Sequence, residues 1–274
     1  MNVNLHRNKP KRAIHPQFKH VNESTEAVAQ YTSSDGKVHN IKFYNLLKQG
    51  YNMDKFIKEQ TLFQRPDHNF STLARLLKKD SVVYDLGAYI GTFSIPFALE
   101  GMKIFSFEAW PENARRCAKN CEPYDVKVFN VALSDKNETK KTQITNCMGW
   151  ANFDENNFQE IKHIRLDDFI KEKKLPLPDL VKMDIEGMET IAMHGMTDLL
   201  ENVRPIWSVG YHFKMESEIE GVAWVDVEDG GFDFSKIGDL DYNIYDEFGR
   251  RVPAGILKNR GGEFTFIPRE KIKS

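Results

Sequence analysis

The sequence predicts an α/β fold built on a doubly wound, mainly parallel sheet. Three segments carry this prediction, at residues 81–91 (SVVYDLGAYIG), 105–113 (FSFEAWPEN) and 180–190 (LVKMDIEGMET). In each segment a short apolar run ends at an acidic residue. Buried strands of parallel sheets are continuous apolar runs, and such sheets bind ligands at the carboxyl ends of their strands. We therefore expect the three acids beside one ligand crevice.

The first segment reads as a strand, a glycine turn and a helix. Asp85 follows the apolar run, and Gly87 and Gly91 would let the backbone turn sharply and approach a ligand. Residues 89–100 have helical spacing, although Pro96 should kink that helix. The turn is not the dinucleotide fingerprint, because an acid precedes the first glycine and one glycine of the trio is missing. A carboxylate favours a cationic group over a phosphate, so we expect an amino or sulfonium ligand; a plain strand-to-helix turn is the alternative.

The second segment places Glu108 at the end of the next strand. It lies 23 residues after Asp85, close to the spacing at which a second-strand acid meets ribose hydroxyls. A carboxylate accepts hydrogen bonds from both hydroxyls of a diol. Pro111 is well placed to open the following helix. The competing interpretation of Glu108 is a solvated acid at a strand end.

The third segment combines charge with an apolar strand. Lys182, Asp184 and Glu186 share one side of the strand by its period of two. Such charges are costly to bury without partners. Asp184 should lie beside the crevice, while an ion pair of Lys182 with Glu186 or Glu189 is the structural alternative. An apolar stripe at helical spacing follows, formed by Met188, Ile191, Ala192, Gly195 and Leu199.

Four motifs together resemble those of a known family. They are DLGAYIGTFSIPFA (85–98), FEAWPENARR (107–116), RLDDF (165–169) and LVKMDIEGMET (180–190). In this order they are similar to the motifs of the FkbM-type S-adenosylmethionine-dependent methyltransferases. The resemblance implies a class I methyltransferase fold, a Rossmann-like sheet of about seven strands with helices on both faces. It also implies methyl transfer to oxygen, commonly on a sugar, lipid or secondary metabolite.

The resemblance also suggests which residues bind S-adenosylmethionine. Glu108 corresponds to the ribose-binding acid, and Asp184 to the acid beside the methionine moiety or the acceptor. One departure is that family members often carry an acid in a P-x-x-x-x-E-x-H pattern, where this chain has Gly210 and retains His212 (PIWSVGYH, 205–212). The expected cofactor-binding set is Asp85, Gly87, Ala88, Gly91, Glu108, Ala109, Val131, Ala132 and Asp184, with Val131 and Ala132 flanking the adenine.

A sulfonium methyl group is already activated, so the enzyme must align an oxygen and remove its proton. His212 is the preferred base, because it lies at a predicted strand end facing the crevice; a structural role is the alternative. Asp184 is the rival base. A third possibility is that Asp184 and Glu186 hold a divalent ion that lowers the pKa of the hydroxyl. The need for a metal is left open.

Length and charge bound the remaining possibilities. The 274 residues fit one large α/β domain with additions. We expect residues 1–65 to be an extension with an irregular tail and helices at 41–63, and residues 66–274 to form the methyltransferase domain. The formal net charge of −2 gives no reason to expect nucleic-acid binding. No apolar run of about 18 residues predicts a membrane span, and the N-terminus lacks a signal-peptide core.

Cysteine usage favours a reduced, cytoplasmic setting. Cys117 and Cys121 lie four apart on a predicted helix and belong to a core stripe, without metal-ligand spacing. The acceptor is expected to be a small molecule, sugar or glycolipid, and the oligomeric state is open. Two other functions compete, a non-catalytic module that kept the cofactor pocket and a nicotinamide-dependent oxidoreductase with a degenerate glycine turn. Trp150 lies in a polar stretch, 134–160. Its two alternative roles are a hydrophobic anchor on the body of the protein and a lid over the acceptor.

Overall fold

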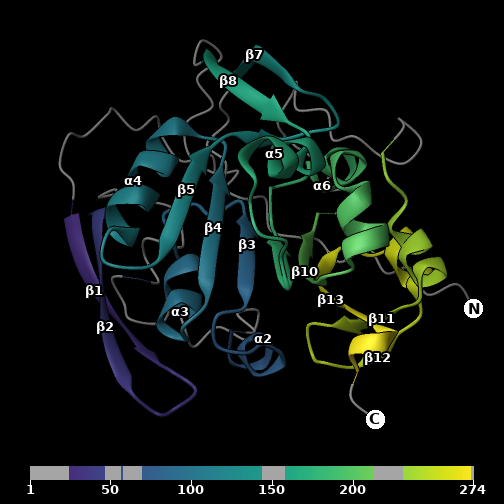
Figure 1. Ribbon diagram of the computed structural model, residues 1–274, viewed down its shortest axis with the longest axis horizontal. Coiled ribbons are helices and arrows are strands. Elements are labelled where there is room, and N and C mark those ends of the chain that lie inside the picture. Colours follow the sequence, from purple (N-terminus) through teal and green to yellow (C-terminus); the bar gives the residue numbers. More distant parts are fainter. Residues whose placement is uncertain (1–24, 47–56, 58–69, 144–157, 213–230, 273–274) are drawn as a thin grey trace, which may run out of the picture.

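The computed structural model describes residues 25–46, 57, 70–143, 158–212 and 231–272. Its main element is an eight-stranded sheet of order β12-β11-β13-β10-β9-β3-β4-β5 (Figure 1). The neighbours from β10 to β5 pair in parallel, whereas β13, β11 and β12 pair antiparallel. The strands are β3 (Val82–Leu86), β4 (Lys103–Glu108), β5 (Val126–Asn130), β9 (Leu180–Met183), β10 (Ile206–Tyr211), β11 (Tyr242–Asp246), β12 (Arg251–Val252) and β13 (Gly262–Pro268).

Strand order fixes where a ligand can sit. From β3 the chain moves outward through β4 to β5, and later returns to place β9 on the other side of β3. The carboxyl ends of β3 and β9 therefore flank a topological switch point, where open α/β sheets bind ligands. Tyr84 packs in one hydrophobic core and Val83 in another, as expected for a strand buried on both faces.

Helices cover both faces of the sheet. Side chains of α2 (Phe70–Leu76), α3 (Ser94–Leu99) and α4 (Pro111–Cys121) pack in one core. Those of α5 (Leu166–Lys173) and α6 (Glu189–Ala192) pack in the other, together with residues 199–200 and 231–257. The predicted doubly wound α/β class is confirmed. Among the described residues, no helix is long and apolar enough to cross a membrane.

Two helix predictions need correction. The helix expected over 89–100 begins only at Ser94, so Pro96 lies in the first turn, where its missing N–H costs no hydrogen bond and no kink is needed. The apolar stripe after Gly187 is not one helix but α6, a 3₁₀ turn at Met193–Gly195 and a π-helical turn at Leu199–Val203. A Cβ at Gly195 would lie 2.1 Å from the Ser134 carbonyl oxygen, so this segment packs directly against the backbone.

The N-terminal part of the described chain is a hairpin of β1 (Thr25–Thr32) and β2 (Val38–Leu46). Residues 25–40 were expected to be irregular and residues 41–46 helical, and both expectations are wrong. The buried side chains alternate along each strand, at Ala29 and Tyr31 and at Ile41 and Phe43. The hairpin lies beside α4 and packs in the same core as α2–α4 (Figure 1).

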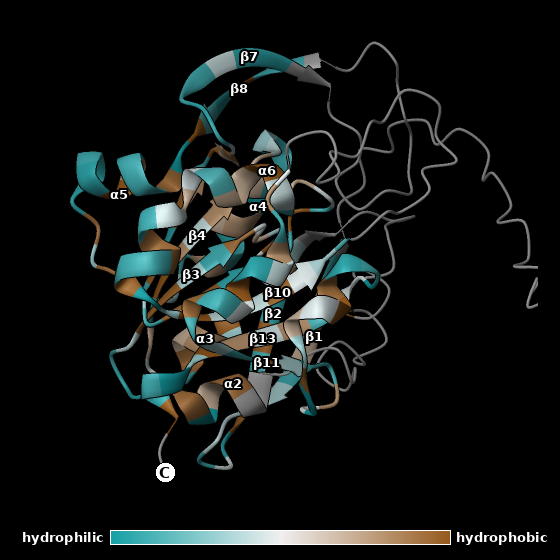
Figure 2. Cartoon of the chain, turned by 90° about the vertical axis from the view of Figure 1, so that its right-hand side faces the viewer, coloured by the Kyte–Doolittle hydropathy of each residue, from teal (hydrophilic) through white to brown (hydrophobic). Residues whose placement is uncertain are grey.

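A second small sheet, β6-β8-β7, leaves the main body near α5 (Figure 1). Its strands are β6 (Ala132–Leu133), β7 (Glu138–Gln143) and β8 (Phe158–Ile164), and β7 is mostly hydrophilic (Figure 2). The segment around Trp150, the basic cluster at 6–12 and residues 47–56 and 58–65 lie outside the described residues. The boundary at residue 65 therefore stays a proposal.

Candidate active site

A cleft lies at the carboxyl ends of β3, β4 and β9, at the switch point of the sheet. Its walls combine apolar side chains with three carboxyl groups and one ammonium group. The side chains and backbone that line it come from Gly87, Tyr89, Thr92, Phe93, Phe107, Glu108, Ala109, Asn113, Ala132, Leu133, Lys182, Asp184, Ile185, Glu186 and Met188.

Gly87 is required by the approach of two strand ends. Its φ is +83°, and a Cβ there would lie 2.0 Å from the Asp184 carbonyl oxygen. The close approach therefore joins the ends of β3 and β9, rather than the backbone and a ligand as the sequence suggested. Gly91, with φ +93°, similarly makes room for Cys121, because a Cβ would lie 2.8 Å from its Sγ. Gly87 lines the cleft, whereas Gly91 packs against α4.

Glu108 ends β4 with its carboxylate turned to the backbone of the glycine turn. Its Oε2 accepts a hydrogen bond from the Tyr89 N–H (2.8 Å) and its Oε1 accepts one from the Trp110 N–H (2.9 Å). Tyr89 adopts φ +51°, an uncommon conformation for a non-glycine residue. Burial raises the pKa of Glu108 to about 7, against the lowering effect of the two backbone hydrogen bonds. Each oxygen keeps acceptor capacity for a ligand hydroxyl.

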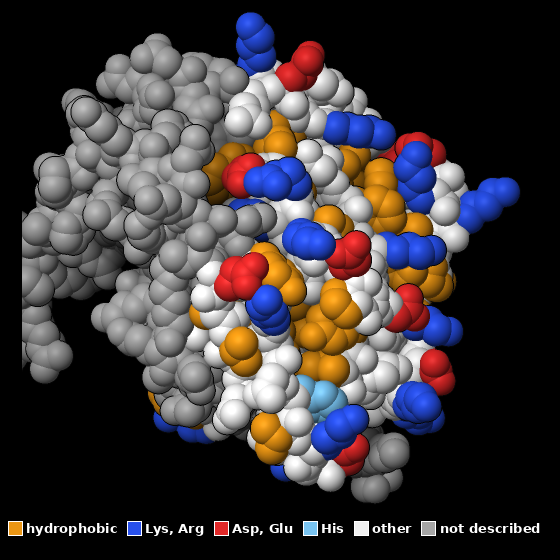
Figure 3. All heavy atoms as spheres, turned by 90° about the vertical axis from the view of Figure 1, so that its left-hand side faces the viewer, with side chains coloured by type: hydrophobic (Ala, Val, Ile, Leu, Met, Phe, Trp, Pro, Cys, Tyr) orange, Lys and Arg blue, Asp and Glu red, His pale blue; other side chains and the backbone are white. Residues whose placement is uncertain are grey.

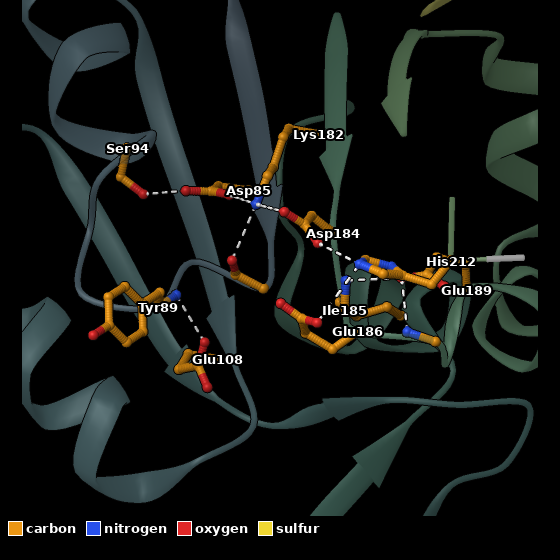
Figure 4. A network of polar contacts seen from close by, with 12 residues as sticks. Asp85, Tyr89, Ser94, Glu108, Lys182, Asp184, Ile185, Glu186, Glu189 and His212 are labelled. Atoms are coloured by element: carbon orange, nitrogen blue, oxygen red, sulfur yellow. Dashed lines mark hydrogen bonds and ion pairs between the residues drawn. The ribbon is translucent and has the colours of Figure 1, made fainter. Parts of the chain in front are cut away.

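Asp85 lies behind the cleft rather than in its wall. It is fully buried, and its Oδ2 accepts a hydrogen bond from the Ser94 hydroxyl (2.6 Å). Its Oδ1 lies 3.4 Å from Nζ of Lys182 (Figure 4). The expected direct contact of Asp85 with the cofactor is therefore not supported. Its carboxylate instead holds Lys182 and the start of α3.

Lys182 links the two strand ends. Its Nζ donates to the Gly87 carbonyl oxygen (3.1 Å), lies 4.0 Å from Asp184 Oδ2, and sits 4.7 Å from the centroid of the Phe93 ring. Burial alone would lower the pKa of Lys182, but the charges of Asp85, Asp184 and a third carboxylate raise it. Its partners are thus not Glu186 or Glu189, the pairs considered from the sequence. The register explains this, because Lys182 lies directly opposite Asp85 in the parallel pair of β3 and β9.

His212 follows β10 and joins the acids after β9 (Figure 4). Its Nδ1 donates to Oε1 of Glu189 (3.0 Å), which also accepts from the N–H groups of Ile185 (3.1 Å) and Gly187 (3.2 Å). Its Nε2 faces two further acids, 3.8 Å from Asp184 Oδ1 and 3.6 Å from Glu186 Oε2. Glu189, 1% exposed, therefore fixes the imidazole so that Nε2 points at the acids.

The charges around His212 bear on which group can accept a proton. Burial alone would lower its pKa, but the hydrogen bond and charge of Glu189, with the charges of Asp184 and Glu186, raise it to about 10. At pH 7 the imidazole is then already protonated, which argues against the sequence-based choice of His212 as base. Burial and the charge of Asp184 raise the pKa of Glu186 to about 7, while His212 opposes this rise. Glu186 is thus near its optimum as a general base.

The same three side chains could hold a metal ion. Single ligand atoms of Asp184, Glu186 and His212 all lie within 4.8 Å of one another. Asp184 Oδ1 is buried and makes no hydrogen bond. Carboxylate oxygens and an imidazole nitrogen suit Mn²⁺ and other divalent ions of intermediate hardness.

The structure brings five of the nine predicted cofactor-binding residues together in the cleft. Gly87, Glu108, Ala109, Ala132 and Asp184 line the cleft. Asp85, Ala88, Gly91 and Val131 do not line it, and neither does His212, which lies behind Asp184 and Glu186. Tyr89, Phe93, Asn113 and Lys182 were not predicted as cofactor-binding residues. For Asn113 a signal existed, because Pro111 opens α4 and so brings its first turn to the end of β4.

A family model, the methyltransferase FkbM domain, matches residues 85–247. The chain belongs to the FkbM methyltransferase family. The resemblance found in the motifs is thereby confirmed, and the sheet order agrees with the class I methyltransferase fold that it implied.

Two curated FkbM relatives share moderate identity. The 2-O-methyltransferase NoeI of Sinorhizobium fredii is 29% identical over an alignment of 158 residues, and the match covers 48% of this chain and 64% of the relative. The hexuronic acid methyltransferase AglP of Haloferax volcanii is 25% identical over 130 residues, 46% of this chain and 54% of the relative. The chain thus matches less than two thirds of the length of either relative.

Solved structures resemble the chain at low identity. A methyltransferase FkbM from Methylobacillus flagellatus is 18% identical with a TM-score of 0.48, covering 78% of this chain and 52% of the other. A putative O-methyltransferase from Klebsiella pneumoniae is 12% identical with a TM-score of 0.42, covering 81% of this chain and 82% of the other.

Proposed function

We propose that this FkbM-family chain transfers a methyl group from S-adenosylmethionine to a hydroxyl oxygen of a sugar, glycolipid or other small molecule. The observation that carries the proposal is the placement of Glu108 beside Tyr89 in a switch-point cleft that Asp184 and Glu186 also line. The names of the relatives, a 2-O-methyltransferase and a hexuronic acid methyltransferase, support an oxygen acceptor. The free, buried thiols of Cys117 and Cys121, with Sγ atoms 3.9 Å apart, support work in a reducing compartment such as the cytoplasm.

The residues of the cleft fit this cofactor. Phe93, Phe107 and Leu133 provide apolar surface for a purine, and the Glu108 carboxylate can accept hydrogen bonds from a ribose diol. The one ammonium group of the lining, that of Lys182, is already paired with Asp85. The remaining carboxylates therefore favour a cation, which suits a sulfonium. When bound, the cofactor supplies an activated methyl group.

The chain itself contributes alignment and proton transfer. Alignment of the acceptor oxygen within a closed cleft lowers the barrier by several kcal/mol, with about 7–11 kcal/mol available for well-oriented reactants. We infer that Glu186 accepts the hydroxyl proton, because it lines the cleft and its pKa is about 7. His212, held by Glu189 as an imidazolium, stabilises the Asp184 and Glu186 carboxylates before that proton is transferred.

The test is release of S-adenosylhomocysteine in the presence of a panel of neutral hexoses, amino sugars, uronic acids and glycolipids. Turnover with a hydroxyl acceptor is the expected result. Binding of S-adenosylhomocysteine without turnover on any acceptor would replace the proposal by the non-catalytic binding module. Quenching of reduced nicotinamide fluorescence by the protein would instead favour the oxidoreductase.

A divalent-ion site is the second arrangement that a specific observation favours. Asp184 Oδ1 has no hydrogen bond, and Nε2 of His212 is too far from both acids, at 3.6 and 3.8 Å, to donate to either. The assay is therefore repeated after chelation and with added Mg²⁺ or Mn²⁺. A general-base role for Glu186 predicts unchanged turnover. Loss on chelation with recovery on adding the ion would assign the three residues to a metal.

A further inference from the structure

Gly210 in β10 lies between two carboxyl groups from neighbouring strands. It pairs directly with Glu263 of β13, and β10 lies beside β9, whose end carries Asp184. A Cβ at Gly210 would meet Glu263 Oε1 at 3.0 Å and Asp184 Cγ at 3.1 Å. The φ of Gly210 is not in the left-handed region. Glycine is therefore needed here for space and not for backbone conformation.

The space above Gly210 is taken by the side chain of Glu263. Residues paired directly across an antiparallel ladder project to the same face, so Glu263 and the missing side chain of residue 210 share one direction. That direction leads to Asp184, which lines the cleft. The half-buried Glu263 therefore lies beside a residue of the cleft, although its own strand is far along the chain.

We propose that Glu263, reaching across Gly210, is an acceptor-positioning residue that selects neutral or amino-sugar hydroxyls over anionic acceptors such as uronates. The inference rests on the proposed methyl transfer and extends it to the class of acceptor. Its physical basis is that carboxylates accept hydrogen bonds from sugar hydroxyls and repel another carboxylate. Asp184 and Glu186 line the cleft, and the Glu263 and Asp184 carboxyl groups both lie beside Gly210.

The experiment compares wild type and Glu263→Gln on a neutral hexose and on the matching uronic acid. Wild type is expected to prefer the hexose. Glu263→Gln should raise the KM for the hexose about tenfold, because a neutral amide oxygen is a weaker hydrogen-bond acceptor than a carboxylate, and it should reduce the preference for the hexose over the uronate. The kcat and the affinity for S-adenosylhomocysteine should change less than about twofold, because Glu263 is proposed to contact neither the cofactor nor the transferred proton. A tenfold change in either quantity would equal the loss of a whole hydrogen bond there. Glu270→Gln, at an exposed ion pair with Arg204, is the matched control and should change neither KM.

Variants that move the carboxylate of Glu263 distinguish a role in positioning the acceptor from a role in folding. Gly210→Ala should raise the KM for the hexose, because its Cβ displaces the Glu263 carboxylate. The double variant Gly210→Glu/Glu263→Gly moves the acid to β10 and removes the contact with Glu263, so that only the Asp184 side chain must shift slightly. It should recover most of the wild-type KM. If Glu263→Gln does not fold, these two variants carry the test.

Two results would overturn the inference. One is a wild-type preference for the uronate, and the other is a hexose KM that stays unchanged in both Glu263→Gln and Gly210→Ala. Either result would leave methyl transfer itself intact, because turnover is still measured. Absence of turnover on every acceptor would instead reject the proposed function.

Discussion

Glu186 and His212 face each other with their pKa values displaced in the same direction for different reasons. Burial raises the pKa of Glu186 to about 7, whereas carboxylate charges overcome burial and raise that of His212 to about 10. At neutral pH the two residues therefore have different roles. The carboxyl group of Glu186 can exchange a proton, whereas the imidazolium of His212 stays protonated. Glu186 also adopts φ +56°, an uncommon backbone conformation for a residue other than glycine.

This division predicts a pH dependence. A base must be deprotonated to act, so turnover should fall as the pH drops through about 7, the pKa of Glu186. Glu186→Gln should reduce kcat by about 10²–10⁴-fold and remove that pH step. The measurement is the pH profile of kcat for both proteins. A variant that keeps the wild-type profile would show that Glu186 is not the base.

Other residues of the site show where sequence reasoning stops. The pattern of apolar runs ending in acids put Asp85, Glu108 and Asp184 at strand ends, and all three are there. It did not give the direction of each side chain, which depends on the partner offered by the neighbouring strand. Asp85 turns inward because Ser94 and Lys182 satisfy it, and Lys182 is visible only once the register is known.

At the scale of elements, the backbone at Gly87 after β3 packs directly against the backbone at Asp184 after β9. Gly87→Ala should therefore be costly, because its Cβ would lie 2.0 Å from a backbone oxygen and φ is positive. We expect the free energy of unfolding to fall by about 3 kcal/mol or more, adding left-handed strain to overpacking. Urea unfolding measures this change.

Gly249→Ala is the matched control for this substitution. Gly249 also has positive φ, at +72°, but a Cβ there meets nothing within 4 Å. Its cost should be the backbone strain alone, about 1–2 kcal/mol. Equal losses in the two variants would mean that the approach of β3 to β9 does not constrain the turn.

Elements with strong local patterns were predictable, and those that depend on packing were not. The strands around residues 82–86, 103–108 and 180–183 have continuous apolar runs, which indicate burial on both faces. The hairpin of β1 and β2 alternates instead, and a few apolar positions after it favoured a helix. The split of the helix after Gly187 depends on Gly195 packing against the Ser134 backbone, which no local pattern encodes.

At the scale of the whole molecule, the N-terminal hairpin is tied to the cleft through one buried side chain. The Nδ2 of Asn120 on α4 donates to the Ile90 carbonyl oxygen (2.9 Å), and its Oδ1 accepts from the Tyr44 N–H of β2 (2.8 Å). Ile90 belongs to the turn that carries Tyr89. The hairpin therefore supports the turn that positions Glu108.

Asn120→Ala leaves both backbone groups without their partner. We expect a loss of about 2–4 kcal/mol in the free energy of unfolding, from two unsatisfied groups. Asn202→Ala is the control, since its hydrogen bond to Asp198 (2.8 Å) is exposed, and it should cost little. Thermal and urea unfolding of both variants provide the measurement. Similar stabilities of the two variants would contradict the claim that Asn120 connects the hairpin to the turn.

The described part of the face drawn in Figure 3 shows no continuous basic patch of the kind that binds nucleic acid. Basic and acidic side chains are interspersed there among the described residues, in keeping with the net charge of −2. Charge gathers instead in and directly behind the cleft, where carboxylates outnumber the cations Lys182 and His212. The proposed methyl transfer therefore depends on an adenosyl ligand that Glu108 holds by its ribose.

Calorimetric titration with S-adenosylhomocysteine tests this claim most directly. For wild type we predict a Kd of about 1 μM, equivalent to roughly −8 kcal/mol, and for Glu108→Ala an affinity at least about tenfold weaker. The control Glu112→Ala, an exposed residue of α4 paired with Arg115, should bind as wild type does. Equal affinity of wild type and Glu108→Ala, or no binding to either, would contradict the account.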